Sequence, residues 1–230
     1  MAFSGFSEDF FHFFDELKAN NNRDWFLANK PRYEASVAAP CLDFIEAMGQ
    51  PLTDISPHML AIPKKIGGSM FRIYRDVRFS KDKTPYKTHA GLQFRHVLGK
   101  DAHAPGFYVH LSSEEILVGG GLWKPPSPAL AKIRARIDEK GKEWARATMS
   151  SAFLTRFDGL REGDPLIRPP KGYDEHHPHI DALKRRSFFV MAKTERDQVM
   201  RADFVDYVAQ VFEDAAPMMA FLCAAIEVAF

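Results

Sequence analysis

A regular alternation of apolar and polar positions runs from residue 71 to residue 79. A period of two predicts a β-strand with one buried face and one polar face. Arg75 falls on the apolar parity, where a bare charge is too costly to bury, so we expect a carboxylate, a ligand or a sheet edge beside it. The apolar parity otherwise consists of Phe71, Ile73, Val77 and Phe79, and the polar parity of Arg72, Tyr74, Asp76 and Arg78.

Shorter runs of the same kind follow this stretch and predict an antiparallel sheet. The turns between them are too short for the crossovers that parallel pairing requires. Glycines 119–121 leave room for a ligand or for tight packing. Trp123 comes directly after them and either stacks on a flat ligand or covers the core. The predicted strands are residues 92–94, 107–111 and 115–119, with a later strand at 187–191.

Apolar residues recur at intervals of three and four toward both ends of the chain, which predicts amphipathic helices. We therefore expect an α+β fold with N-terminal and C-terminal helices packed against a central, largely antiparallel β-sheet. A last helix should begin at Pro217, and its apolar sides should be buried or lie in a homo-oligomer interface. We expect a single domain over 1–230, with helices at about 7–50, a mixed sheet core at about 64–192 and C-terminal helices at about 194–230.

Positive charge is concentrated between residues 69 and 91. Six Lys and Arg residues face two Asp residues there, a local charge of +4 in a chain with a net charge of +1. Arg binds phosphate or carboxylate through paired hydrogen bonds and Lys adds a mobile charge, so the segment predicts an anion-binding site. Internal ion pairs with Asp76 and Asp82 on a solvated surface are the alternative. The predicted ligand-binding residues are Arg72, Arg75, Arg78, Lys81, Lys83 and Lys87.

Candidate catalytic residues lie in the same segment. The chain has no G-x-S-x-G nucleophile motif and no paired-cysteine zinc spacing. An enzyme here would therefore work through charge stabilisation and proton transfer. Tyr74, Tyr86 and His89 are the proton-transfer candidates, and Asp76 would orient a neighbouring arginine. No particular cofactor is indicated.

A second polar region follows further along the chain. Two consecutive prolines stiffen the loop that carries Arg168 and Lys171, which we expect to form a second wall of the anion site. A histidine cluster comes next, in which His176 and His179 could share one helical face. A proline interrupts the cluster and the H-E-x-x-H spacing is absent, so we expect no metal site.

The bulk properties narrow the class of protein. A net charge of +1 argues against binding to nucleic acid or membrane by overall charge. Cys41 and Cys223 lie in apolar surroundings and should be free, buried thiols, as is typical of cytosolic proteins. The sequence shows neither a signal peptide nor a long uncharged run. We therefore expect a cytoplasmic protein with no membrane partner.

Several segments carry a resemblance to a known family. The most specific is FRIYRDVRFSKDKTPYKTH at residues 71–89. The chain resembles the domain-of-unknown-function 2461 family from near its N-terminus to about Phe189. That family name carries no activity, so the resemblance implies a shared fold and an Arg/Lys segment that is the family's most characteristic feature. The other matching segments are NNNRDWF at 20–26, GFYVHL at 106–111, GGGLWKP at 119–125 and RPPKGYD at 168–174.

Three functions are compatible with these patterns. The first is a site for a phosphorylated or carboxylated small molecule, built on the cationic segment. The second is a nucleic-acid-binding module or nuclease, in which Tyr74, Phe79 and Tyr86 would stack on bases. The third is a non-catalytic scaffold or oligomerising protein, in which the Arg/Lys motif is an internal salt-bridge network.

Overall fold

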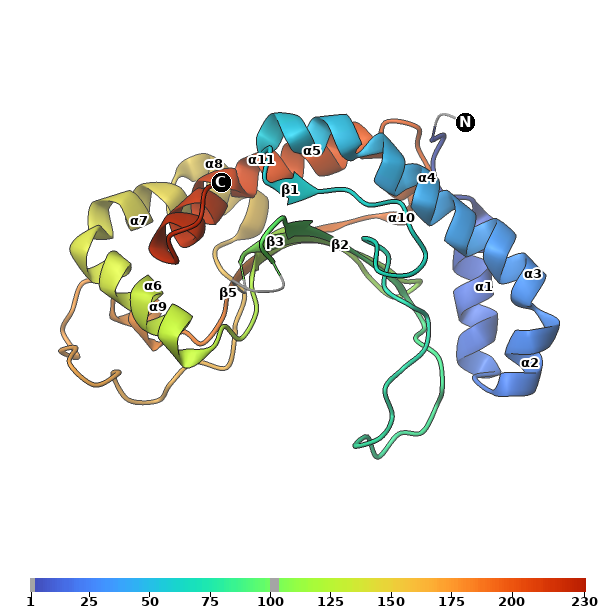
Figure 1. Ribbon diagram of the computed structural model, residues 1–230, viewed down its shortest axis with the longest axis horizontal. Helices are drawn as coiled ribbons and strands as arrows, with labels where there is room; N and C mark the ends of the chain where they lie inside the picture. The colour runs from blue at the N-terminus through green and yellow to red at the C-terminus, as the bar shows by residue number, and fades with distance from the viewer. Residues whose placement is uncertain (1–2, 100–103) are drawn as a thin grey trace.

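The structure, a computed structural model, describes residues 3–99 and 104–230. It confirms the predicted α+β class, with an antiparallel sheet and helices at both ends of the chain. The first N-terminal helices lie together at one end of an arch, and the later ones run from there along its outer side (Figure 1). They are α1 (Glu8–Ala19), α2 (Arg23–Ala28), α3 (Lys30–Tyr33), the π-helical turn η1 (Glu34–Ala38), α4 (Ala39–Ala47) and α5 (Gly49–Ile55).

The sheet has the order β1–β2–β3–β4–β5, and every neighbouring pair is antiparallel. The meander predicted from the short turns is confirmed, with Val109 of β3 opposite Val118 of β4. β5 pairs with β4 after a long helical segment. The strands are β1 (Met59–Leu60), β2 (Ala90–His96), β3 (Gly106–Leu111), β4 (Ile116–Leu122) and β5 (Phe188–Thr194).

The helical segment between β4 and β5 forms the other end of the arch (Figure 1). It includes a long irregular connection from 158 to 179, and β5 leads from it into the C-terminal helices. The helices between β4 and β5 are α6 (Ser127–Glu139), α7 (Gly141–Thr148), α8 (Ser151–Phe157) and α9 (Ile180–Lys184). The helices after β5 are α10 (Arg196–Val199) and α11 (Phe204–Ala225).

One face of the sheet is fully buried. Helices α4, α5 and α11 lie over this face, along the outer side of the arch (Figure 1). Phe94, Phe107 and Val190 point into the resulting core and have no exposed surface. The ring of Phe107 stacks on that of Phe212 in α11, with centroids 4.3 Å apart. The opposite face, on the inner side of the arch, stays partly open.

Helix α11 differs from the prediction in one respect. Pro217 lies inside one continuous helix and does not start a new one. Met218 and Met219 beside it are fully buried, and this packing on both sides holds the helix together where proline removes a hydrogen bond. Although α11 has the length and composition of a membrane span, its apolar sides pack in the core of the chain. This burial accounts for its apolar character, and oligomerisation through it stays a prediction.

The predicted strand at 71–79 is the main error in the predicted elements. Residues 70–89 form a long extended hairpin, here called the arm, which projects from the sheet edge (Figure 1). Only the isolated bridges Met70↔Leu92 and Tyr74↔Tyr86 give it strand-like pairing. Ile73 is buried as the alternation predicts, but Phe79 near the tip is 97% exposed because no element packs over it.

Both cysteines are free and buried, Cys41 in α4 and Cys223 in α11. Burial raises the pKa of both thiols, to about 12 for Cys223. They therefore stay protonated and unreactive at neutral pH.

We expect Gly121→Ala to lower the free energy of unfolding by about 2 kcal/mol or more. Gly121 has φ +145°, and an added Cβ would lie 2.2 Å from the carbonyl oxygen of Phe188. Urea denaturation followed by circular dichroism measures the change. Gly49→Ala is the control, because nothing lies within 4 Å of its Cβ position at the start of α5. It should change stability by less than about 1 kcal/mol, and equal losses in both variants would contradict the prediction.

Candidate functional site

The arm is anchored at its base by residues from the N-terminal helices. The Asn21 side chain donates to the carbonyl oxygen of Tyr86 at 2.9 Å and accepts from the Tyr86 N–H at 3.1 Å. It thus pairs with the Tyr86 backbone much as a strand would. The Tyr86 ring is 4% exposed and stacks on Phe26 of α2, with centroids 4.1 Å apart. Tyr86 therefore fixes the arm in place and cannot stack on a base.

Two of the predicted anion-binding arginines are already paired within the arm. Arg75 lies beside Asp82, and Arg78 makes paired hydrogen bonds to Asp76 at 2.6 and 2.9 Å. The N–H and hydroxyl of Thr84, together with Arg75, lower the pKa of Asp82 to about 2. The alternative of internal ion pairs thus describes these two arginines.

Lys87 is different, because it is partly buried and no carboxylate in residues 3–99 and 104–230 lies within salt-bridge distance. Its ammonium donates to the carbonyl oxygen of Arg72 at 2.8 Å and lies 5.3 Å from the centroid of the Phe71 ring. Burial, and then the nearby Arg72, lower its pKa. Lys87 is therefore a cation held partly out of water without a counterion of its own.

A pocket of about 380 Å³, here called the arm pocket, lies between the arm and α1. Lys18 enters it from α1, while Arg75, Lys87, Thr88 and His89 enter it from the arm. These residues offer cations, a hydroxyl and an imidazole to a ligand. Asp82 also lines the pocket, where it pairs with Arg75, and Lys18 pairs with Glu114. Among the cations of this pocket, Lys87 is therefore the one that can receive an external anion without giving up a carboxylate of the described chain.

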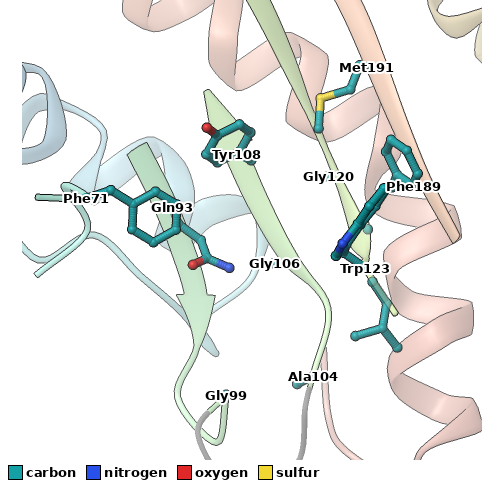
Figure 2. Close-up of a pocket in the computed structure, with 12 residues that line it drawn as sticks. Phe71, Gln93, Gly99, Ala104, Gly106, Tyr108, Gly120, Trp123, Phe189 and Met191 are labelled. Carbon is teal, nitrogen blue, oxygen red and sulfur yellow. The ribbon is translucent and has the colours of Figure 1, made fainter. Parts of the chain in front are cut away.

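A larger pocket of about 610 Å³, here called the sheet pocket, lies on the open face of the sheet. Figure 2 shows two groups of side chains across a hollow. The exposed Trp123 ring is edge-on to Phe189, with centroids 4.9 Å apart. The first group is Phe71, Gln93 and Tyr108, and the second is Trp123, Phe189 and Met191.

Gly91 permits the close packing at one wall of the sheet pocket. A Cβ at this position would lie 2.7 Å from the Tyr108 hydroxyl and 2.9 Å from the Phe71 ring. A side chain here would therefore push both aromatic residues out of place.

Three polar residues connect the two pockets. The His89 ring in the arm pocket lies 4.4 Å from the ring of His110 on β3. The Nδ1 atom of His110 is 3.5 Å from the Tyr108 hydroxyl, which reaches the sheet pocket. Burial, followed by His110 and Lys87, lowers the pKa of His89 to about 4, and burial also lowers the pKa of His110. Both imidazoles are neutral at pH 7 and can accept hydrogen bonds or protons.

Other candidates lie elsewhere in the structure. The exposed Lys81 and Lys83 lie near the tip of the arm, and the half-exposed Tyr74 pairs with Tyr86. Arg168 and Lys171 are exposed in the 158–179 connection at the other end of the arch (Figure 1). The structure does not bring them to the arm, and neither lines the arm pocket.

The two histidines considered for metal binding do not converge. His176 is exposed beside Glu175, whereas the ring of His179 packs against Gly141. Within the described ranges, no group of three His, Cys, Asp or Glu side chains is arranged to hold a metal ion.

The sequence interpretation missed most of the sheet pocket. Tyr108 and His110 occupy the parity of β3 opposite the buried one, and Phe189 and Met191 do the same on β5. The alternation was visible, and large side chains on the second parity were the available signal. Trp123 lies at the pocket rim, where it can stack on a flat ligand.

Residues 9–221 match the family model described as conserved hypothetical protein (DUF2461). The chain belongs to this family. The resemblance carried by the arm sequence is thus confirmed, and the DUF2461 match covers both pockets. No curated protein and no solved structure matches the chain.

We expect Asn21→Ala to loosen the arm of this DUF2461 protein while leaving the sheet intact. The variant loses both hydrogen bonds to the Tyr86 backbone, so exchange of the Tyr86 amide should accelerate about tenfold or more, equivalent to ~1.4 kcal/mol of local opening. Hydrogen–deuterium exchange of peptides from the arm measures this effect. Asn20→Ala is the control, since among the described residues that side chain bonds only to the Glu16 carbonyl oxygen of α1. Unchanged exchange in Asn21→Ala would contradict the proposed anchor.

We expect His89 to make the protein less stable as the pH falls from about 6.5 to about 4. In this window the unfolded chain binds a proton that the folded His89 does not, so stability decreases with falling pH. His89→Gln should reduce the loss between pH 7 and 4.5 by about 1 kcal/mol, allowing for partial exposure of the ring. Urea denaturation at several pH values measures it. The exposed His176→Gln variant should keep the parental dependence, and an identical dependence in His89→Gln would refute the effect.

Proposed function

We propose that this protein binds a small anionic molecule, phosphorylated or carboxylated, that also carries a planar ring. The position of Lys87 carries the proposal. Lys87 lines the arm pocket, and its ammonium lies against Phe71, which lines the sheet pocket. An anion bound at Lys87 therefore leaves the rest of the ligand within reach of the sheet pocket.

The charge at Lys87 favours an external anion. Partial burial without a carboxylate partner costs free energy, and a bound phosphate or carboxylate would offset that cost. Thr88 and His89 line the same pocket and can add hydrogen bonds. Arg75 also lines the arm pocket, although its guanidinium already forms an ion pair with Asp82.

The sheet pocket favours a ring. Phe71 and Tyr108 lie 6.1 Å apart between centroids on one side, and Trp123 and Phe189 form the opposite side. Aromatic walls bind planar rings by offset or edge contacts, while the Gln93 amide can fix the orientation. A small phosphorylated ligand also fits the cytoplasmic location that two free thiols favour.

We expect adenosine monophosphate to bind more tightly than either adenosine or inorganic phosphate alone, because only the nucleotide fills both pockets. Lys87→Gln should weaken nucleotide binding about tenfold, or ~1.4 kcal/mol. Isothermal titration calorimetry of the three probes, with other nucleoside monophosphates and aromatic carboxylates as further probes, measures these affinities.

Lys142→Gln is the matched control. Lys142 is exposed on α7, far from both pockets, and carries the same charge. It should leave binding unchanged. Absence of binding by every probe, or equal losses in the two variants, would refute the proposed site.

A further inference from the structure

We propose that the ring-bearing anion is part of single-stranded nucleic acid, with bases on the sheet pocket and phosphates along the arm. This inference rests on the proposed function, because it uses the same Lys87-centred site. It adds that the site extends beyond one nucleotide, across the sheet pocket to a second pair of aromatic side chains and along the arm toward its tip.

The first observation is that the sheet pocket has two separate aromatic platforms. Phe71 packs beside Tyr108 near β2 and β3, whereas Trp123 packs against Phe189 on β5. The two platforms lie two strand spacings apart from Tyr108 on β3 to Phe189 on β5, and three from β2 to β5, which is about 10 to 14 Å at ~4.8 Å each. One base cannot cover both platforms, but two bases of one chain can. Aromatic side chains on an open sheet face are a recurrent way of binding unpaired bases.

The second observation is that the arm's cations are spread out. Lys87 and the exposed Arg72 lie together at the base of the arm, where the Lys87 ammonium donates to the Arg72 carbonyl oxygen, while Lys81 and Lys83 lie near its tip. Within the described part of the chain, none of these four has a carboxylate within salt-bridge distance. A single phosphate cannot contact them all. A chain with a phosphate at every nucleotide can.

The third observation is the segregation of charge. Residues 61–99 hold nine Lys and Arg against two Asp, a charge of +7, in a chain of net charge +1. The remainder of the chain is therefore net negative. A near-neutral total thus conceals one strongly positive region, which contains the arm and β2 and attracts a polyanion to the open face.

The geometry favours single strands over duplexes. In a duplex the bases are stacked on one another, so they cannot also lie on Phe71 or Trp123. Tyr86 is buried, so the bases would stack on the sheet and not on this tyrosine of the arm.

Fluorescence anisotropy with a labelled 12-nucleotide single strand tests the proposal, with its duplex and a mononucleotide as competitors. We expect the single strand to bind at least tenfold more tightly than the mononucleotide. Its affinity should fall as salt rises from 50 to 200 mM, with a log–log slope of roughly −2 to −3 for three or four phosphate contacts.

Two variants separate the polymer site from the mononucleotide site. Trp123→Ala should weaken oligonucleotide binding about tenfold and mononucleotide binding by a clearly smaller factor, because only the single strand places a separate base on this platform. Trp123 is 60% exposed, so the fold should persist, and the exposed Met149→Ala on the far helical end is its control. The double variant Lys81→Gln/Lys83→Gln should lower the magnitude of the salt slope by about 1 to 1.5.

The outcomes distinguish the two proposals. If the mononucleotide binds and the oligonucleotide binds no more tightly, the polymer inference is wrong and the proposed function stands. If the duplex binds as tightly as the single strand, the stacking geometry is wrong. If neither the nucleotide nor the oligonucleotide binds, both proposals fail.

Discussion

The packing of α11 across one face of the sheet is the interaction on which the rest of the structure depends. The Phe107–Phe212 stack and the fully buried side chains around it hold β3 and β4 against this helix. Because the helices cover that face alone, the opposite face of the sheet is left partly open. The same alternation that builds the core therefore also supplies the lining of the sheet pocket.

The arm depends on a second, local constraint. Its residues have no sheet neighbour beyond the first pair, so their position is set by Asn21 and by the Tyr86–Phe26 stack. Arg75 and Arg78 are neutralised by the arm's own carboxylates and stiffen it. Lys87, left without such a partner beside Phe71, is the cation available to an external anion.

The fold could be predicted because its main signals are local. Short turns between alternating runs dictate an antiparallel meander whatever the rest of the chain does. The arm was mispredicted because alternation shows only that a strand is possible, whereas pairing needs a free sheet edge. The edge of β2 is shared between β1, opposite Arg95, and the start of the arm, opposite Leu92, so nothing remains for the residues around Phe79.

The candidate site was predicted in its residue types, whereas its ion pairs with Asp76 and Asp82 were only one of two alternatives. Local spacing showed the cations, yet only the folded turn brings Asp82 to Arg75. Likewise, the alternation of Tyr108 with its buried neighbours was visible, but which face a distant helix would cover was not. Pairing and coverage both depend on contacts between segments far apart in the sequence.

The burial of the two native cysteines has a practical consequence for studying the arm. Thiols with raised pKa values and no exposed surface react slowly with maleimides and other electrophiles. A cysteine introduced in place of the solvent-exposed Ser4 or Lys83 would thus be labelled selectively, without first removing Cys41 or Cys223. A pair of spin labels at positions 4 and 83 would then report the distance between the N-terminal segment and the tip of the arm in the native sequence background.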